Sequence, residues 1–391
     1  MADLNKTSNI TSTIKPLDRL NICMEYLNVR EETNTEISLK ITAYSLALGL
    51  AMIGNILVIV IVLRKTHFKT TTNLFIVNMA FSDVMMALIC MTISIYSIAV
   101  KNMGQSTFQG ILGLLICKLL PFLQGISVAV SILTLSTLAA DRFLAIVYPF
   151  QNFISKFRAK ILIVLIWMVA ALFNAPLIYA MKFYKEGGVM VCYEIWEPYF
   201  DEERASKNYT IVLFVFLYAI PLILVTFFYT ALIRELWRGK SLHSNKTRAF
   251  AENKSVVKMV MTIIIAFAVC WLPIHVNNFI VLFSSDEMIK YCGLKHSIIF
   301  IGWFMGHVNT SINPIIYFTY NEKFRKELKN MYRAVREIFA GKKRTTSATT
   351  ALSIVKPRII VTQFNAQNDV VTLEPKVGDF GEANSGFEVS T

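Results

Sequence analysis

Polar residues in the middle of the chain are spaced so that one helix face would carry an amide, a hydroxyl and an ion pair. No charged side chain occurs between Lys118 and Asp141. Gln124, Ser131 and Arg142 fall close to one face at 3.6 residues per turn. An amide and a hydroxyl donate and accept hydrogen bonds, and a guanidinium pairs with a carboxylate. This set favours binding and switching, because neither a nucleophile–base set nor a metal cluster accompanies it, as an enzyme would require.

A membrane-spanning helix is the element expected to position these residues. An uncharged run of this length is typical of a helix that crosses a bilayer. Gln124 and Arg142 would lie roughly 27 Å apart along the axis, about the thickness of a bilayer core. Polar groups on a lipid-facing surface are costly, so this face is expected to lie inside a bundle.

Seven apolar runs of spanning length occur in the chain. They cover residues 40–63, 73–99, 117–149, 160–181, 209–233, 256–283 and 297–319. Hydrophobic residues make up 55% of the 391 positions and charged residues 17%, whereas soluble proteins carry about a quarter charged residues. The sequence therefore predicts an all-α membrane protein with a seven-transmembrane helix bundle. A channel or transporter is disfavoured because no internal repeat or continuous polar pathway is visible.

Basic residues predict the orientation of the bundle. The net charge of +13 lies in short loops and not in a nucleic-acid-binding patch, so no nucleic-acid partner is expected. Lys and Arg follow the first, third, fifth and seventh runs, which places the N-terminus outside the plasma membrane and the C-terminus inside. Asn5 and Asn9 lie in glycosylation sequons, in agreement with an external N-terminus. The expected parts are an extracellular tail (1–37), the bundle (38–320), an amphipathic helix on the inner leaflet (321–332) and a disordered cytoplasmic tail (333–391).

The polar and aromatic residues of the seven runs form an ordered set of motifs. They are Gly54-Asn55, Asp83, Asp141-Arg142-Phe143, Trp167, Pro221, Tyr229, CWLP at 270–273 and NPIIY at 313–317. With these motifs, residues 38–332 resemble a rhodopsin-like (class A) G protein-coupled receptor. DRFLAIVYPF and the segment 192–198 are most similar to neuropeptide Y, neuropeptide FF and RFamide receptors. The resemblance implies an extracellular peptide ligand, a heterotrimeric G protein, arrestin, receptor kinases and the surrounding membrane lipid as partners.

The resemblance also predicts a ligand pocket. Its expected residues are Gln124, Val128, Trp271, His275, Asn278, Phe279, Trp303 and His307. Amine receptors carry an aspartate where this chain has Gln124, and an amide suits a peptide backbone or a C-terminal amide. Opsins need a lysine where this chain has His307. The alternatives are a lipid or small neutral ligand, and polar side chains that bond only to their neighbours. The acidic loop between the fourth and fifth runs favours a basic peptide.

Cysteines and membrane-embedded polar residues give two further expectations. A disulfide between Cys117 and Cys192 is implied by the resemblance, and two thiols outside the cell would oxidise. For Cys23 and Cys292, a second disulfide and free thiols remain equally open. Asp83, Ser131, Asn309 and Asn313 match the positions that hold a sodium ion in the family, the alternative being a hydrogen-bond network without the ion. No other metal or cofactor is expected.

The resemblance finally assigns coupling to the G protein and its regulation. The switch residues would be Asp141, Arg142, Tyr229, Pro273, Pro314 and Tyr317. Many relatives hold the arginine with a glutamate at the base of the sixth helix, where this chain has Asn253 beside Glu252, so we expect a raised basal activity. Phosphorylation would fall on Thr345, Thr346, Ser347, Thr349 and Thr350, creating an anionic patch for arrestin.

Overall fold

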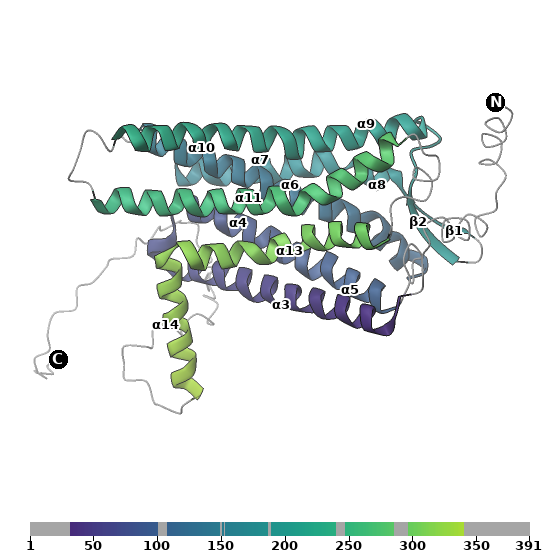
Figure 1. The fold of residues 1–391 in the computed structure, drawn as a ribbon, viewed down its shortest axis with the longest axis horizontal. Coiled ribbons are helices and arrows are strands. Elements are labelled where there is room, and N and C mark those ends of the chain that lie inside the picture. The colour runs from purple at the N-terminus through teal and green to yellow at the C-terminus, as the bar shows by residue number, and fades with distance from the viewer. Residues whose placement is uncertain are drawn as a thin grey trace, which may run out of the picture. The chain divides into compact units, whose positions relative to one another are not determined.

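The computed structural model of the chain describes residues 32–100, 108–148, 151, 153–186, 189–239, 247–284 and 296–339. The chain divides into two units, Met1–Arg333 and Ala334–Thr391. The first unit is a bundle of long helices that run side by side, with a small hairpin at one end and helix α14 leaving the other (Figure 1). We refer to these as the hairpin end and the α14 end. Of the second unit, the described part is the helical stretch 334–339.

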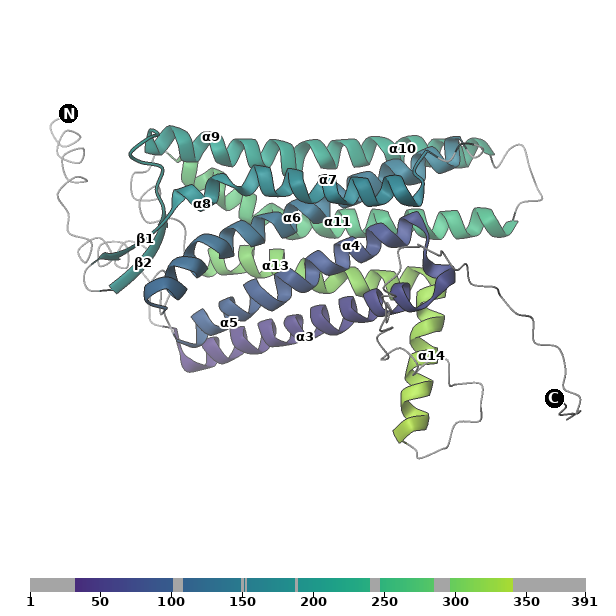
Figure 2. The same cartoon turned by 180° about the vertical axis from the view of Figure 1, so that it is seen from behind.

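The long helices of the bundle lie side by side in both views (Figures 1 and 2). Within the described residues they form seven spans of membrane length. They are α3 (Asn34–Arg64), α4 with α5 (Thr71–Met86 and Thr92–Ala99), α6 (Gly110–Val147), α7 with α8 (Lys156–Asn174 and Pro176–Ala180), α9 with α10 (Glu202–Phe214 and Ile220–Gly239), α11 (Thr247–Phe283) and α13 (His296–Tyr320). Six of them combine the length and hydropathy of a membrane span. The seventh, α13, contains His307, Asn309 and Asn313, which lower its mean hydropathy. The predicted seven-helix fold is confirmed.

Local sequence signals set the ends of several helices. Thr33 and Glu36 form a reciprocal capping box at the start of α3. Asp201 caps α9 by accepting a hydrogen bond from the backbone N–H of Arg204. Between α9 and α10, the π-helical turn η3 (Val215–Ala219) precedes Pro221, whose missing N–H and bulky ring disturb the regular ladder. A second π-helical turn, η2 (Ala87–Met91), joins α4 to α5.

The bundle is held together by apolar packing and by buried polar links between spans. Asn78 of α4 donates to Thr134 of α6 (2.8 Å) and accepts from the indole N–H of Trp167 of α7 (2.8 Å). Gly54 lets α3 approach α13, since a Cβ there would lie 2.6 Å from the Cβ of Pro314. Residues from α3, α4, α6, α10, α11 and α13 share one apolar core.

Two elements differ from the sequence-based expectation. The connection between α8 and α9 contains an antiparallel hairpin of β1 (Met181–Glu186) and β2 (Val189–Glu194), an exception to the all-α prediction. Helix α14 (Glu322–Phe339) was expected to end near residue 332 but continues, because no glycine or proline interrupts it before Gly341.

Helix α14 is anchored near its start by aromatic and ionic contacts. Phe324 is fully buried and meets the ring of Phe68 edge-on, with 4.9 Å between centroids. Phe68 lies in the short turn η1 (Thr66–Phe68) that follows α3. The Lys65 ammonium lies 3.0 Å from the carboxylate of Glu327. These contacts tie α14 to the loop between α3 and α4.

Candidate functional site

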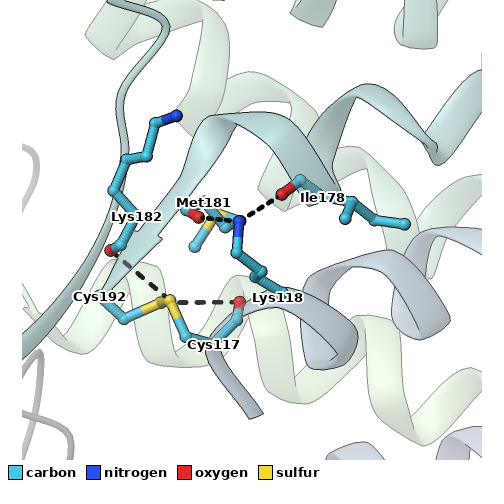
Figure 3. The surroundings of a disulfide bond; sticks show 6 residues. All are labelled: Cys117, Lys118, Ile178, Met181, Lys182 and Cys192. Atoms are coloured by element: carbon cyan, nitrogen blue, oxygen red, sulfur yellow. Dashed lines mark hydrogen bonds between the residues drawn. A yellow bond between two sulfur atoms is a disulfide. The ribbon is translucent and has the colours of Figure 1, made fainter. Parts of the chain in front are cut away.

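A disulfide bond joins the hairpin to α6. Cys117 of α6 is bonded to Cys192 of β2, 75 residues later in the chain (Figure 3). The predicted bridge is therefore confirmed. Because β1 and β2 pair along their length, with Phe183 opposite Cys192, the bond fixes the whole hairpin to the end of α6.

Lys118, the residue next to Cys117, also bonds α6 to the start of the hairpin. The ammonium of Lys118 donates to the carbonyl oxygens of Ile178 (2.6 Å) and Met181 (3.0 Å), as Figure 3 shows. Ile178 lies in α8 and Met181 begins β1, so one ammonium group bonds two backbone carbonyls at the point where the fourth span ends. Positive charge there also complements the negative end of the helix dipole. Lys118 thus holds the start of the hairpin, whereas Cys117 holds its second strand.

The far side of the loop is ordered by Trp196. The carboxylate of Glu202 accepts from the Trp196 backbone N–H (2.6 Å), and that of Glu194 accepts from its indole N–H (2.7 Å). The Tyr179 hydroxyl donates to the Trp196 carbonyl (2.9 Å). Two of the loop carboxylates therefore have structural partners, and both still contribute negative charge to this end of the molecule.

Deeper in the bundle, Gln124, His307 and Tyr44 form a chain of polar contacts across α6, α13 and α3. The Gln124 side-chain amide nitrogen lies 3.4 Å from His307 Nε2, and the Tyr44 hydroxyl lies 3.2 Å from His307 Nδ1. With the amide as donor, Nε2 accepts and Nδ1–H donates to Tyr44, which defines one tautomer of the imidazole. Gln124 and His307, both expected in the ligand pocket, do come together.

Of the other expected pocket residues, Trp303 lies beside His307, with 6.2 Å between ring centroids, whereas His275 and Phe279 both pack on Phe214. Trp271 is buried, and a Cβ at Gly306 would lie 3.2 Å from its ring, so α13 closes over the indole. His275 packs against Tyr218 with tilted rings, at 4.3 Å between ring centroids. Phe279 packs on Phe214 of α9, and the side chain of Asn278 accepts a hydrogen bond from Asn277. Val128 packs on the apolar core, and Trp303 is 38% exposed.

A buried polar cluster lies around Asp83. The amide of Asn313 donates to Asp83 Oδ2 (2.9 Å), and the Asn55 amide donates to the carbonyl of Thr310 (3.0 Å). Side-chain oxygens of Asn55, Asp83, Asn309 and Asn313 are buried without a hydrogen-bond partner. Ser131 is also buried. Unpartnered carboxylate and amide oxygens are the ligands of a hard cation, so the residues fit a sodium ion. Among the described residues, no group of three or more His, Cys, Asp and Glu could hold a metal.

At the α14 end, Arg142 is held by its neighbour. Its guanidinium donates to Asp141 Oδ2 from Nη2 (2.5 Å) and Nε (3.1 Å). The Tyr229 hydroxyl is buried without a partner, and that of Tyr317 lies 3.9 Å from the Met79 sulfur. Pro273 and Pro314 lie inside α11 and α13, where each removes a backbone hydrogen bond.

A hydrogen bond that sequence reasoning missed joins the same end of α11 to α13. The Ser255 hydroxyl donates to the carbonyl of Tyr320, the last residue of α13, at 2.6 Å. Ser255 lies two residues after Asn253, whose side chain is outside the described part of the structure. A lone serine gives no sequence signal for such a contact. Lys118, a charge inside an apolar span, and Tyr44, a polar ring in another, could have been singled out.

Several expected sites lie outside the described residues. They are Cys23, Cys292, Asn5, Asn9, Thr345, Thr346, Ser347, Thr349 and Thr350. The second disulfide, glycosylation and phosphorylation therefore stay predictions.

Comparison with known proteins agrees with this geometry. The family model described as "7 transmembrane receptor (rhodopsin family)" matches residues 54–317. A QRFP-like peptide receptor of Branchiostoma floridae is 32% identical over 302 residues, covering 72% of this chain and 74% of that protein. A substance-P receptor of Meriones unguiculatus is 30% identical over 309 residues (78% and 74%), and neuropeptide FF receptor 2 of Mus musculus is 30% identical over 312 residues (75% and 72%).

The seven-span bundle, the tethered hairpin and the Asp141–Arg142 pair define a membrane receptor. The chain belongs to the rhodopsin family of seven-transmembrane receptors, the class A G protein-coupled receptors. It is thus a multi-pass protein of the plasma membrane and not an enzyme.

Proposed function

We propose that this receptor binds a peptide at the hairpin end, outside the cell, and activates a heterotrimeric G protein at the α14 end, inside. The observation that carries the proposal is the order of the functional residues along α6. This helix carries the hairpin on Cys117 and Lys118, the Gln124 amide in the bundle, and Arg142 at its other end. A change at Gln124 can therefore be transmitted along one rigid element to Arg142.

A peptide fits the hairpin end better than an amine does. The amide of Gln124 is only half-buried and lies at hydrogen-bond distance from His307, so a ligand amide can replace or extend that contact. No carboxylate occupies this position to pair with an ammonium group. The negative charges of Glu194 and Glu202 favour a basic peptide. Three relatives are named as receptors for peptides, which supports the same class of ligand.

The test is a screen of synthetic C-terminally amidated peptides on cells that express the receptor, with calcium and cyclic AMP as readouts. With an active peptide in hand, Gln124→Ala should weaken the response by about 1–3 kcal/mol, or roughly five- to 150-fold, because a polar partner loses its bond. Thr226→Ala is the matched control, since Thr226 is exposed to lipid and bonds only within its own helix. Activation by a simple amine at low concentration, or by a neutral lipid with no peptide response, would overturn the peptide assignment.

The oxygens around Asp83 would hold an allosteric sodium ion, with Ser131, Asn309 and Asn313 as neighbours. The unpartnered oxygens support this proposal. The ion would add positive charge between α4, α6 and α13 and favour the resting arrangement. Sodium should lower agonist affinity in the native receptor and have no such effect in Asp83→Asn. An equal sodium effect in both receptors would place the ion elsewhere.

Receptor kinases and arrestin would act on the C-terminal tail. Phosphates on Thr345, Thr346, Ser347, Thr349 and Thr350 would form a dense anionic patch behind Lys342, Lys343 and Arg344. Truncation after Gly341 should spare G protein signalling and reduce arrestin recruitment. Undiminished recruitment by the truncated receptor would show that the tail has no such role.

A further inference from the structure

A groove of about 440 Å³ lies between α9 and α11, towards the hairpin end of the bundle. Phe214 forms one wall, and a stripe of α11 from Leu272 to Phe283 forms the other. The α11 residues follow one another at three- and four-residue steps, so they line one helix face over roughly 16 Å. The volume falls within the range of small-molecule sites, about 300–1,000 Å³.

The groove opens sideways, towards the membrane. Three of its α11 side chains are about half exposed on the surface of the bundle, namely Leu272 (50%), Val276 (46%) and Phe283 (52%). All three are apolar and lie within a membrane span. An occupant would therefore enter from the lipid, and its long axis would follow α11.

A positive charge stands at the outer end of this apolar groove. The ammonium of Lys207, on α9, lies 4.3 Å from the ring centroid of Phe283. Phe283 stacks in turn on Phe279, with 5.7 Å between centroids. Among the described residues, no carboxylate forms an ion pair with Lys207. The groove thus combines a long apolar wall with one cation at the membrane surface.

We propose that this groove binds a long-chain fatty acid. The carboxylate would pair with Lys207, and the single alkyl chain would lie along the α11 stripe. A sterol would leave the ammonium without a charged partner, and a zwitterionic phospholipid would bring its own positive charge towards it. His275 and Phe279, which were expected in the ligand pocket, line this groove, whereas Gln124 and His307 do not. The groove lies next to the hydrogen bond from Tyr218 to the Ala268 carbonyl (2.8 Å), which joins the fifth and sixth spans, so the fatty acid would influence how these spans separate.

The experiment uses the full-length receptor in phosphatidylcholine nanodiscs and a diazirine-labelled oleate as the probe. Light-induced adducts should concentrate on residues 272–283. Lys207→Gln should reduce labelling about tenfold, the effect of losing one charge-assisted hydrogen bond, and Lys207→Arg should retain it. Val276→Trp should also reduce labelling, because the larger ring fills the groove. Lys182→Gln is the matched control, since Lys182 lies 3.9 Å from the Tyr179 ring, away from the groove.

Competition distinguishes the fatty acid from other lipids. Unlabelled oleate should displace the probe, and oleyl alcohol and cholesterol should not. Equal displacement by oleyl alcohol, displacement by cholesterol, unchanged labelling of Lys207→Gln, or adducts spread evenly over all spans would each overturn the proposal. None of these outcomes depends on the peptide or the G protein, so the proposed function is tested separately.

Discussion

The two ends of the bundle are fastened by contacts of different strength. At the hairpin end, adjacent residues of α6 provide a covalent bond through Cys117 and two charge-assisted hydrogen bonds through Lys118. At the α14 end, among the described residues, the Ser255 hydroxyl gives a neutral hydrogen bond between α11 and α13, and Arg142 is bonded to the carboxylate next to it. The Lys65–Glu327 ion pair at this end holds α14 and not α11. The Tyr229 hydroxyl nearby is buried without a partner.

The difference matches what each end has to do. A ligand is bound with less loss of entropy when the loop that covers it is already ordered. A helix that must swing outward can be held by few and weak contacts, because the resting and active states then differ by only a few kcal/mol. One neutral hydrogen bond contributes about 0.5–1.5 kcal/mol, whereas removing a native disulfide costs about 2–5 kcal/mol. These contacts fit the proposed function, in which the hairpin end would be a fixed frame and the α14 end a switch.

Breaking the Cys117–Cys192 disulfide should have the largest effect on the receptor. We expect Cys192→Ala to abolish surface expression or ligand binding, because β2 loses its bond to α6. Antibody labelling of intact cells and maleimide labelling of the freed Cys117 thiol measure the two consequences. Cys90→Ala is the control, since Cys90 is a buried free cysteine, and most of its surface expression should remain. Normal expression of Cys192→Ala with no new reactive thiol would contradict the bridge.

Removing Arg142 should separate the functions of the two ends. Arg142→Ala is expected to lower nucleotide exchange on a purified G protein to the level seen without receptor, with ligand binding largely intact. In the proposed function, movement of α11 would free the guanidinium to face the G protein, whereas the ligand would bind at the other end. Arg158→Ala is the control, because Arg158 is exposed at the same end and donates to the Phe153 carbonyl. Full coupling by Arg142→Ala would refute the proposed switch.

The cation at Lys118 should matter less than the disulfide beside it. Lys118→Met keeps the aliphatic stem and removes the donor, at an expected cost of about 1–3 kcal/mol. Amides of residues 181–194 should then exchange with deuterium several-fold faster in the purified receptor, and Lys118→Arg should restore part of the protection. Unchanged exchange in the hairpin would mean that the disulfide alone holds it.

Much of this arrangement was predictable from residue type and spacing, and the rest depends on pairings that a sequence does not display. Uncharged runs predicted the seven spans, ordered motifs identified Asp83 and Arg142, and the family resemblance implied the Cys117–Cys192 disulfide. The hairpin was missed because its strands are short and lie in a loop of mixed composition. The contacts of Ser255 and Lys118 were missed because each uses a backbone carbonyl of another span, and every residue offers one.

The smallest and most informative effect concerns the restraint on α11. Sequence alone predicts a raised basal activity, because Asn253 replaces the glutamate that many relatives pair with the arginine. The structure adds a restraint nearby, the 2.6 Å bond from Ser255 to the Tyr320 carbonyl, which outward movement of α11 would break. Ser255→Ala should therefore raise agonist-free signalling, and a loss of about 1 kcal/mol corresponds to roughly fivefold.

A second substitution tests whether the two restraints are interchangeable. Asn253→Glu should lower basal signalling, by several-fold at most because a charge pair near the surface is worth about 0–1 kcal/mol. In the Ser255→Ala background it should bring the signal back towards that of the native receptor, and cyclic AMP measured at matched surface expression reads out all three variants. Thr262→Ala is the control on the same helix, since its hydroxyl bonds only to the Lys258 carbonyl within α11, and it should leave basal signalling unchanged. If Ser255→Ala does not exceed this control, the hydrogen bond does not restrain α11, and the apolar packing of α11 against its neighbours must restrain it instead.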